Sequence, residues 1–211
     1  MTVKNAGALI VGGGEGKRIG YDKKNLVLNG KTLISSQITT LKVVFDEIIV
    51  SSNNDFYCEN VVTVKDTLGK GPLAGIFRGL SVSKNSALFV TACDMPFISI
   101  DYIRFVLAAA EEHPCDVCAV KRDDGFIEPF NAVYKKSALP AVAESLRAGC
   151  YKVQNLFNKL RVKTIPAQAA VHFDKNGTAE EIFFNINYAH DLETAQARMD
   201  AAPRGGLPQH C

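Results

Sequence analysis

Short β-favouring runs alternate with helical periods through the first 120 residues of this 211-residue chain. The predicted strands are residues 8–11, 47–52, 61–65, 87–92 and 116–120. Apolar residues at helical spacing mark two helix faces between them, over residues 34–41 and, after a candidate cap at Ser99, over residues 100–110. Strands and helices that alternate in this way predict a Rossmann-like, doubly wound α/β fold, with a mostly parallel sheet covered by helices on both faces.

The second half of the chain has a looser pattern. Residues 126–134 resemble a strand that Pro129 interrupts, and a strand pair is predicted at 162–165 and 182–186. Helices are predicted at 137–148, 151–160 and 190–201. Because no linker rich in Pro, Gly or Ser divides the halves, we expect a single domain over residues 1–202. The segment PRGGLPQHC at 203–211 carries two prolines and two glycines and is expected to be disordered.

Composition excludes several classes of function. The net charge is only +2 and the pI is about 8.2, so the chain lacks the basic field of a dedicated nucleic-acid binder. No stretch reaches the roughly 18 apolar residues that span a bilayer, so no membrane partner is expected. The six cysteines are too scattered for a disulfide scaffold or a zinc knuckle, which favours reduced thiols and a cytoplasmic protein.

A glycine-rich segment follows the first predicted strand, with glycines at 12, 13, 14, 16 and 20. Such a backbone can turn successive N–H groups toward a phosphate chain, and Arg18 and Lys23 add positive charge. The segment lies at the carboxyl end of a strand, where α/β sheets bind their ligands. It matches neither a Walker A loop nor the G-x-G-x-x-G fingerprint, which excludes a P-loop NTPase and a dehydrogenase. The sequence therefore predicts a phosphate-binding loop of another kind.

Four motifs in order resemble the molybdenum cofactor guanylyltransferase family, within the nucleotidyltransferase superfamily. The first is VGGG at 11–14 with RIG at 18–20 and DK at 22–23, similar to L-A-G-G-x-x-x-R-M-G-x-D-K. The others are GPLAGI at 71–76, CDMPF at 93–97 and NIN at 185–187. The resemblance spans residues 11–187 and implies a nucleotide-diphospho-sugar transferase type of fold. It also implies transfer of GMP from GTP to molybdopterin or molybdenum cofactor, with cofactor-synthesis proteins and molybdoenzymes as further partners.

Asp94 is the strongest single candidate, because it follows the apolar run at 87–92 and should emerge at the carboxyl edge of the sheet. A lone carboxylate there suits Mg²⁺, which binds through one or two protein oxygens plus substrate phosphates. A helix cap for the segment near Ser99 is the alternative. Nucleotidyl transfer mainly requires charge neutralisation, so Arg18, Lys23 and Asp94 are the predicted catalytic residues, with Asp94 as the metal ligand.

The nucleotide-binding residues predicted from loop and resemblance together are Val11, Gly12, Gly13, Gly14, Lys23, Ser51, Asp66, Gly71 and Asp94. The resemblance places guanine near Ser51 and Asp66, and the Asp66 carboxylate could accept from the guanine N1–H and amine. Asp66 could also be an ordinary turn residue. Ser51, Gly12 and Tyr188 depart from the family pattern, which more often has asparagine, alanine and threonine there.

The acceptor side is predicted to involve Asn185 and Asn187, which would share one face of a strand and direct their amides to the acceptor or a metal-bound phosphate. Two turn asparagines are the alternative. An anionic pterin phosphate would need some of the scattered cations of the second half, although most of them are expected to be solvated: Lys121, Arg122, Lys135, Lys136, Arg147, Lys152 and Lys159.

Other functions remain open from the sequence. A cytidylyltransferase acting on a phosphorylated acceptor is the nearest, although such relatives typically resemble L-A-A-G in the first loop and lack the GPLAG motif. Sugar-1-phosphate nucleotidyltransferases usually look longer. A nucleotide-binding regulatory module without turnover is the non-enzymatic alternative, and the presence of both Lys23 and Asp94 argues against it.

Overall fold

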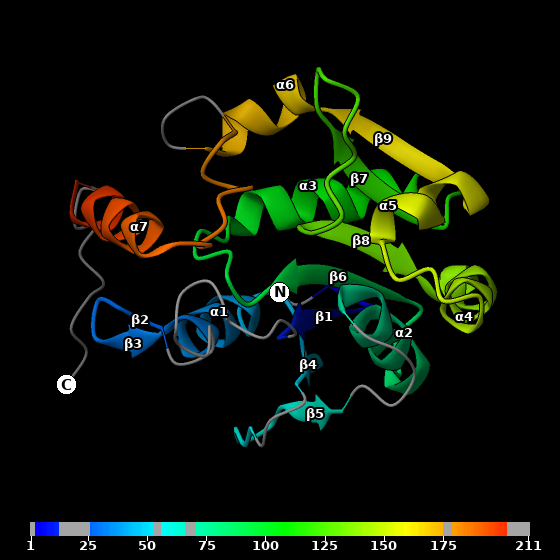
Figure 1. Ribbon diagram of the computed structural model, residues 1–211, viewed down its shortest axis with the longest axis horizontal. Coiled ribbons are helices and arrows are strands. Elements are labelled where there is room, and N and C mark those ends of the chain that lie inside the picture. Colours follow the sequence, from blue (N-terminus) through cyan, green and yellow to red (C-terminus); the bar gives the residue numbers. More distant parts are fainter. Residues whose placement is uncertain (1–2, 13–25, 53–55, 66–70, 175–178, 202–211) are drawn as a thin grey trace.

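The computed structural model describes residues 3–12, 26–52, 56–65, 71–174 and 179–201 (Figure 1). Seven strands in this part of the chain form one sheet, in the order β5-β4-β1-β6-β8-β7-β9. Their bounds are β1 Ala6–Val11, β4 Ile48–Ser51, β5 Val62–Val64, β6 Ala87–Ala92, β7 Val117–Lys121, β8 Ala132–Lys135 and β9 Val162–Pro166. Neighbouring strands pair in parallel except that β8 runs antiparallel to both β6 and β7. The predicted mostly parallel α/β fold is confirmed.

Helices cover both faces of the sheet. The first face carries α1 (Leu33–Leu41), α3 (Ile100–Glu111) and α6 (Ala167–Ala170), and the second carries α2 (Pro72–Val82), α4 (Leu139–Arg147) and α5 (Val153–Leu156). Short 3₁₀ turns lie at η2 (Lys136–Ala138), η3 (Phe157–Lys159) and η4 (Val171–Phe173). Successive residues of β1 point to opposite faces, so all six of its residues are buried. An apolar core therefore packs on each face of β1, which explains why its sequence is hydrophobic without interruption.

A third, smaller apolar cluster joins segments that are far apart in the sequence. The hairpin of β2 (Val27–Leu28) and β3 (Lys31–Thr32) lies beside α7 (Ala189–Ala201), which Figure 1 draws in red next to the blue hairpin. Leu28 and Leu33 pack there with Ile186 and Ala195. The backbone N–H of Asn29 also donates to the Gln196 side chain at 3.3 Å. The last described helix is therefore anchored on the segment that follows the glycine-rich loop.

Two predictions about the second half need correction. Residues 182–186 were expected to form a strand, but they form turns and irregular backbone. The predicted strand over 126–134 starts only at Ala132, because Pro129 has no N–H to donate and Asn131 adopts a left-handed φ of 50°. The single-domain prediction stays a prediction, and residues 203–211 lie outside the described part of the chain.

Asp116 forms a polar junction at the start of β7. Its carboxylate accepts hydrogen bonds from Arg161 Nη2 at 2.7 Å, Arg161 Nε at 3.0 Å and Ser137 Oγ at 2.6 Å. These contacts connect β7, β9 and η2 at one end of the sheet. The guanidinium of Arg161 holds the pKa of Asp116 well below its ordinary value, although burial opposes this shift.

We expect Asp116→Asn to lower the free energy of unfolding at pH 7 by about 1–2 kcal/mol, because Arg161 is left without its charged partner. A depressed carboxyl pKa contributes stability above the unfolded value near 3.9, and that contribution is lost as the pH falls through the folded value. Urea unfolding between pH 7 and pH 3 should therefore show a weaker acid dependence for the variant. The exposed Glu144, which pairs with Lys159, provides Glu144→Gln as the control. Equal acid dependence in wild type and Asp116→Asn would contradict this role.

Candidate active site

The carboxyl ends of β1, β4 and β6 meet at one edge of the sheet. Val11 pairs in register with Ser51 on one side and with Ala92 on the other. Hydrogen bonds continue the pairing beyond the strands, from Gly12 N to Ser51 O at 2.7 Å and from Cys93 N to Val11 O at 3.0 Å. Asp94 follows directly. Sheet pairing therefore brings three sequence-predicted residues, Val11, Ser51 and Asp94, to one edge.

The turn that carries Asp94 is held from beneath by Gln37 of α1, a side chain that is only 2% exposed. Gln37 Nε2 donates to the backbone oxygens of Ala92 at 2.8 Å and Met95 at 2.7 Å. A buried amide with two carbonyl partners fixes the turn on either side of the carboxylate. This role was not predicted, although a single glutamine among the apolar residues of a helix face was a signal available in the sequence.

The N-terminus of α2 lies against the same edge. Gly71 adopts a φ of 78° immediately before the helix, a conformation that favours glycine. One turn later, a Cβ on Gly75 would lie 2.8 Å from Ser51 Oγ, so glycine is needed for this close approach. The start of α2 thus lies near the end of β1, and the N-terminus of a helix suits an anionic ligand.

Asn185 and Asn187 reach this edge without the predicted strand. Ile186 N donates to Asp94 O at 2.9 Å, which ties the segment to the turn after β6. The backbone N–H groups of Asn187 and Tyr188 each donate to Asp191 Oδ2, at 2.8 Å. Asp191 lies at the start of α7. The segment is therefore held by these hydrogen bonds and not by strand pairing with the sheet.

A cavity of about 420 Å³ brings the predicted residues together. Val11, Asp94, Asn185 and Asn187 all line it, as does Pro72 at the start of α2. Ser51 and Gly71 lie on the neighbouring strand end and helix start but do not line this cavity. The remaining candidates, Gly13, Gly14, Arg18, Lys23 and Asp66, lie outside the described residues.

The cavity also contains two charged residues that were not among the candidate site residues. Arg122 was one of the second-half cations, of which most were expected to be solvated and some to serve the pterin phosphate, and Glu128 was not considered. Arg122 Nη1 lies 3.4 Å from Glu128 Oε1, and the Glu128 side chain is only 9% exposed. Burial raises the pKa of Glu128, and Arg122 opposes this shift. A lone carboxylate inside the apolar run FIEPF was the signal available in the sequence.

The donor set of the cavity fits a hard divalent cation. Asp94 offers a carboxylate, and Asn185 and Asn187 offer amide oxygens in the same cavity. The part of the chain that the structure describes contains no cluster of three or more His, Cys, Asp or Glu that could enclose a metal by itself. The Asp94 carboxylate, with room for substrate oxygens beside it, suits Mg²⁺, which keeps several non-protein ligands.

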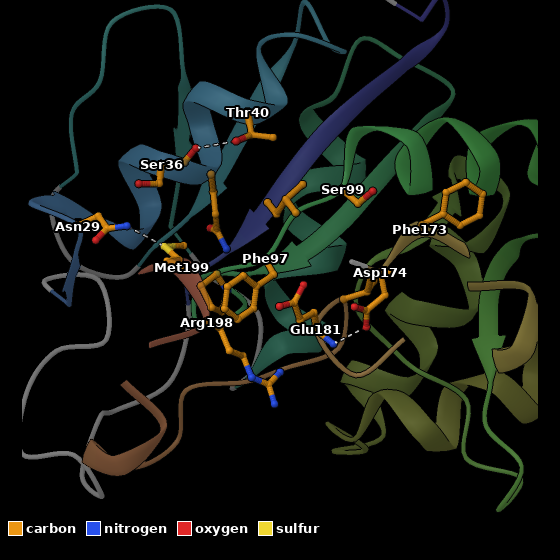
Figure 2. A pocket seen from close by; sticks show the side chains of 14 residues that line it. Asn29, Ser36, Thr40, Phe97, Ser99, Phe173, Asp174, Glu181, Arg198 and Met199 are labelled. Atoms are coloured by element: carbon orange, nitrogen blue, oxygen red, sulfur yellow. Dashed lines mark hydrogen bonds between the residues drawn. The ribbon is translucent and has the colours of Figure 1, made fainter. Parts of the chain in front are cut away.

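A second hollow of about 400 Å³ lies between α1, α7 and the residues after β6 (Figure 2). Figure 2 shows Ser36 and Thr40 of α1 on one side and Arg198 and Met199 of α7 on another, with Phe97 between them. None of the sequence-predicted site residues within the described ranges lines it. The candidate site is therefore the cavity at Asp94.

No helix within the described ranges is both long and apolar enough to cross a membrane. The five described cysteines form no disulfide with one another, and Cys118 lies inside β7 as predicted for a buried structural thiol. The cytoplasmic location stays a prediction.

Comparison with known proteins gives one consistent result. The model of the MobA-like NTP transferase domain matches residues 8–164. The chain is 34% identical over 194 residues to the molybdenum cofactor guanylyltransferase of Syntrophotalea carbinolica, covering 90% of each chain. It is 33% identical to a probable molybdenum cofactor guanylyltransferase of Peptoclostridium acidaminophilum, covering 94% of this chain and 92% of the relative. The crystal structure of molybdopterin-guanine dinucleotide biosynthesis protein A from Archaeoglobus fulgidus superposes with a TM-score of 0.81 at 26% identity, covering 92% of this chain and 99% of that one.

Proposed function

The chain belongs to the MobA-like NTP transferase family, and from this premise we propose that it transfers GMP from GTP to the phosphate of molybdopterin or molybdenum cofactor. An oxygen of the acceptor phosphate attacks the α-phosphorus of GTP, and the bond to the bridging oxygen of the β-phosphate breaks. The products are the guanine dinucleotide and pyrophosphate. The family supports a transferase, and the names of the relatives support these substrates.

One observation carries the proposal. Val11, Asp94, Asn185 and Asn187 come from motifs spread over most of the chain, yet they line one cavity at the carboxyl edge of the sheet. Parallel α/β sheets bind ligands at this edge. The cavity therefore joins the start of the glycine-rich segment to the proposed acceptor side, as a two-substrate reaction requires.

The proposed roles follow from charge. Amides of Gly12, Gly13 and Gly14, with Arg18 and Lys23, would neutralise the triphosphate and the departing pyrophosphate. Asp94 would hold Mg²⁺, which when bound offsets phosphate charge. Asn185 and Asn187 would orient the acceptor phosphate through their amides. The chain has to supply positioning and charge rather than a covalent nucleophile, because the attacking group is already an anion.

Base selection is proposed on the other side of β1, near Ser51 and Asp66. If the Asp66 carboxylate accepts from the guanine edge, ATP would present a lone pair in place of the N1–H, at a penalty of a few kcal/mol. We expect GTP to be preferred to ATP by about a hundredfold, and Asp66→Ala to erode this preference more than it lowers the maximal rate.

The experiment is a panel of GTP, CTP, ATP and UTP with Mg²⁺, in which the shift in melting temperature reports binding and product formation with molybdopterin reports transfer. GTP should give the largest shift and the fastest transfer. Faster transfer with CTP would establish a cytidylyltransferase instead. A shift with GTP but no transfer to any phosphorylated acceptor would favour a regulatory nucleotide-binding module.

We also propose that the activity resides in the cytoplasm, where molybdopterin would arrive from cofactor-synthesis proteins and the product would pass to molybdoenzymes. This placement is supported by the similarity to cofactor-biosynthesis proteins and by the sparse, scattered cysteines of the sequence.

A further inference from the structure

Arg122 and Glu128 face each other across a short hairpin beyond the end of β7. Arg122 N donates to Phe126 O at 2.8 Å and Glu128 N donates to Val120 O at 2.8 Å, which fixes the two arms. Gly125, with a φ of 87°, permits the tight turn. Arg122 also contacts Asp124 at 3.3 Å, so its position is set from two sides. A guanidinium and a carboxylate are thereby held side by side at the cavity wall.

The Glu128 carboxylate has capacity for more hydrogen bonds than the protein supplies. Among the described residues, Arg122 is its one hydrogen-bond partner, at 3.4 Å and thus at the long end of the range. A carboxylate can accept about four hydrogen bonds, and a buried one that lacks donors is costly. Since Glu128 lines the cavity, a ligand with adjacent N–H donors could supply them.

Aromatic side chains surround the pair. Phe126, Phe130 and Phe183 line the same cavity, and the Arg122 guanidinium lies 5.7 Å from the centre of the Phe126 ring. Phe126 is 40% exposed, so part of its ring remains available to a ligand. This combination of flat apolar walls and one donor–acceptor pair is typical of a site for a planar heterocycle.

The position in the sheet indicates which substrate this heterocycle belongs to. The sheet order places β4 and β5, with the proposed base site, on one side of β1, whereas β6, β8 and β7 lie on the other. Arg122 and Glu128 lie on the β7 side of the sheet. Asp94 lies between this pair and the proposed base site. The second planar ring of the reaction is the pterin of the acceptor.

We propose that Arg122 and Glu128 recognise the 2-amino-4-oxo edge of the acceptor's pterin ring, an inference that rests on the proposed function. Glu128 accepts from the ring N3–H and the 2-amino group, and Arg122 donates to the 4-oxo group. The two adjacent donors and one acceptor along this edge match a carboxylate beside a guanidinium. The phenylalanine side chains pack against the ring faces.

The experiment compares pterin with lumazine, in which a carbonyl replaces the 2-amino group. Fluorescence titration of 6-hydroxymethylpterin and 6-hydroxymethyllumazine is carried out on the full chain with GTP and Mg²⁺ present. Wild type should bind the pterin at least about tenfold more tightly, since lumazine turns a lone pair toward the carboxylate. Glu128→Gln should abolish this preference, because its amide can also donate. Asp123→Asn, an exposed change of equal charge in the same turn, should keep it.

Steady-state kinetics with molybdopterin provide the second readout. Glu128→Gln should raise the KM for molybdopterin about tenfold or more and leave the KM for GTP unchanged. Equal affinity of wild type for the two rings, no binding of either, or a parallel rise in both KM values would overturn the inference. Transfer to molybdopterin without a pterin preference would refute this site alone, whereas a pterin preference without transfer would refute the proposed function and leave the site.

Discussion

Asp94→Asn is expected to lower turnover by about 10²–10³-fold with the fold intact. The amide keeps the shape of the carboxylate and loses the charge proposed to hold Mg²⁺. The backbone oxygen of Asp94, which accepts from Ile186 N at 2.9 Å, is unaffected by the substitution. Initial rates of pyrophosphate release over a range of Mg²⁺ concentrations, at saturating GTP, measure the effect. Excess Mg²⁺ should restore little of the lost rate.

Asp101→Asn is the matched control for this variant. Asp101 lies in the first turn of α3, its side chain is 79% exposed, and its contact with Arg104 is a surface pair of 3.7 Å. Its substitution should leave turnover within about twofold, because exposed pairs contribute little. Near wild-type turnover of Asp94→Asn at low Mg²⁺ would remove Asp94 from the proposed chemistry and leave the fold assignment untouched.

The largest loss of stability is expected for Tyr102→Ala, at about 3–5 kcal/mol in the free energy of unfolding. Tyr102 is 1% exposed, and its ring meets Phe173 and Phe183 edge-on, with centroids 6.1 and 6.0 Å apart. Its hydroxyl donates to Asn131 O at 2.7 Å. Removal of the ring would leave a cavity beneath the segment that carries Asn185. Urea denaturation measures the loss.

Tyr102→Phe separates the ring from the hydroxyl. It should cost only about 1 kcal/mol, because the ring remains and one hydrogen bond is lost. If the two variants are equally destabilised, the hydroxyl rather than ring packing holds this region. If neither variant loses stability, the packing of Tyr102 against Phe173 and Phe183 makes no net contribution to the free energy of unfolding.

The parallel half of the fold could be predicted because each buried strand is a short run of β-favouring residues that can be recognised by itself. The predicted strand at 87–92 coincides with β6, and the others differ from the structure by one or two residues at their ends. Helix α2 was not anticipated, because Gly75 and Gly79 weaken any helical pattern. These glycines serve tertiary packing. A Cβ on Gly79 would lie 2.6 Å from Leu9 Cδ2, so glycine lets the helix approach the sheet closely.

The site could be predicted in part for a similar reason. Val11 and Asp94 follow strands, so the sheet topology dictates where they lie. Glu128 and Arg122 were missed as a pair because a hairpin contact between residues six apart leaves no periodic pattern. Asn185 and Asn187 line the same cavity as Asp94, and their acceptor-side role stays a prediction. Their segment is held there by hydrogen bonds from Ile186 N to Asp94 O and from Asn187 N to Asp191 rather than by strand pairing.

The apolar cluster that joins the β2–β3 hairpin to α7 affects how this protein matures on the ribosome. Asn29 and Gln196, which bond to each other there, are separated by 167 positions, or about 8 to 30 s of synthesis. Until residues 186–195 emerge, Leu26, Leu28 and Leu33 lack their packing partners, and the Asp94 turn lacks its bond from Ile186. The sheet can therefore form before residues 186–195 are available, yet the edge that carries the candidate site cannot be completed until α7, the last described helix, has left the exit tunnel.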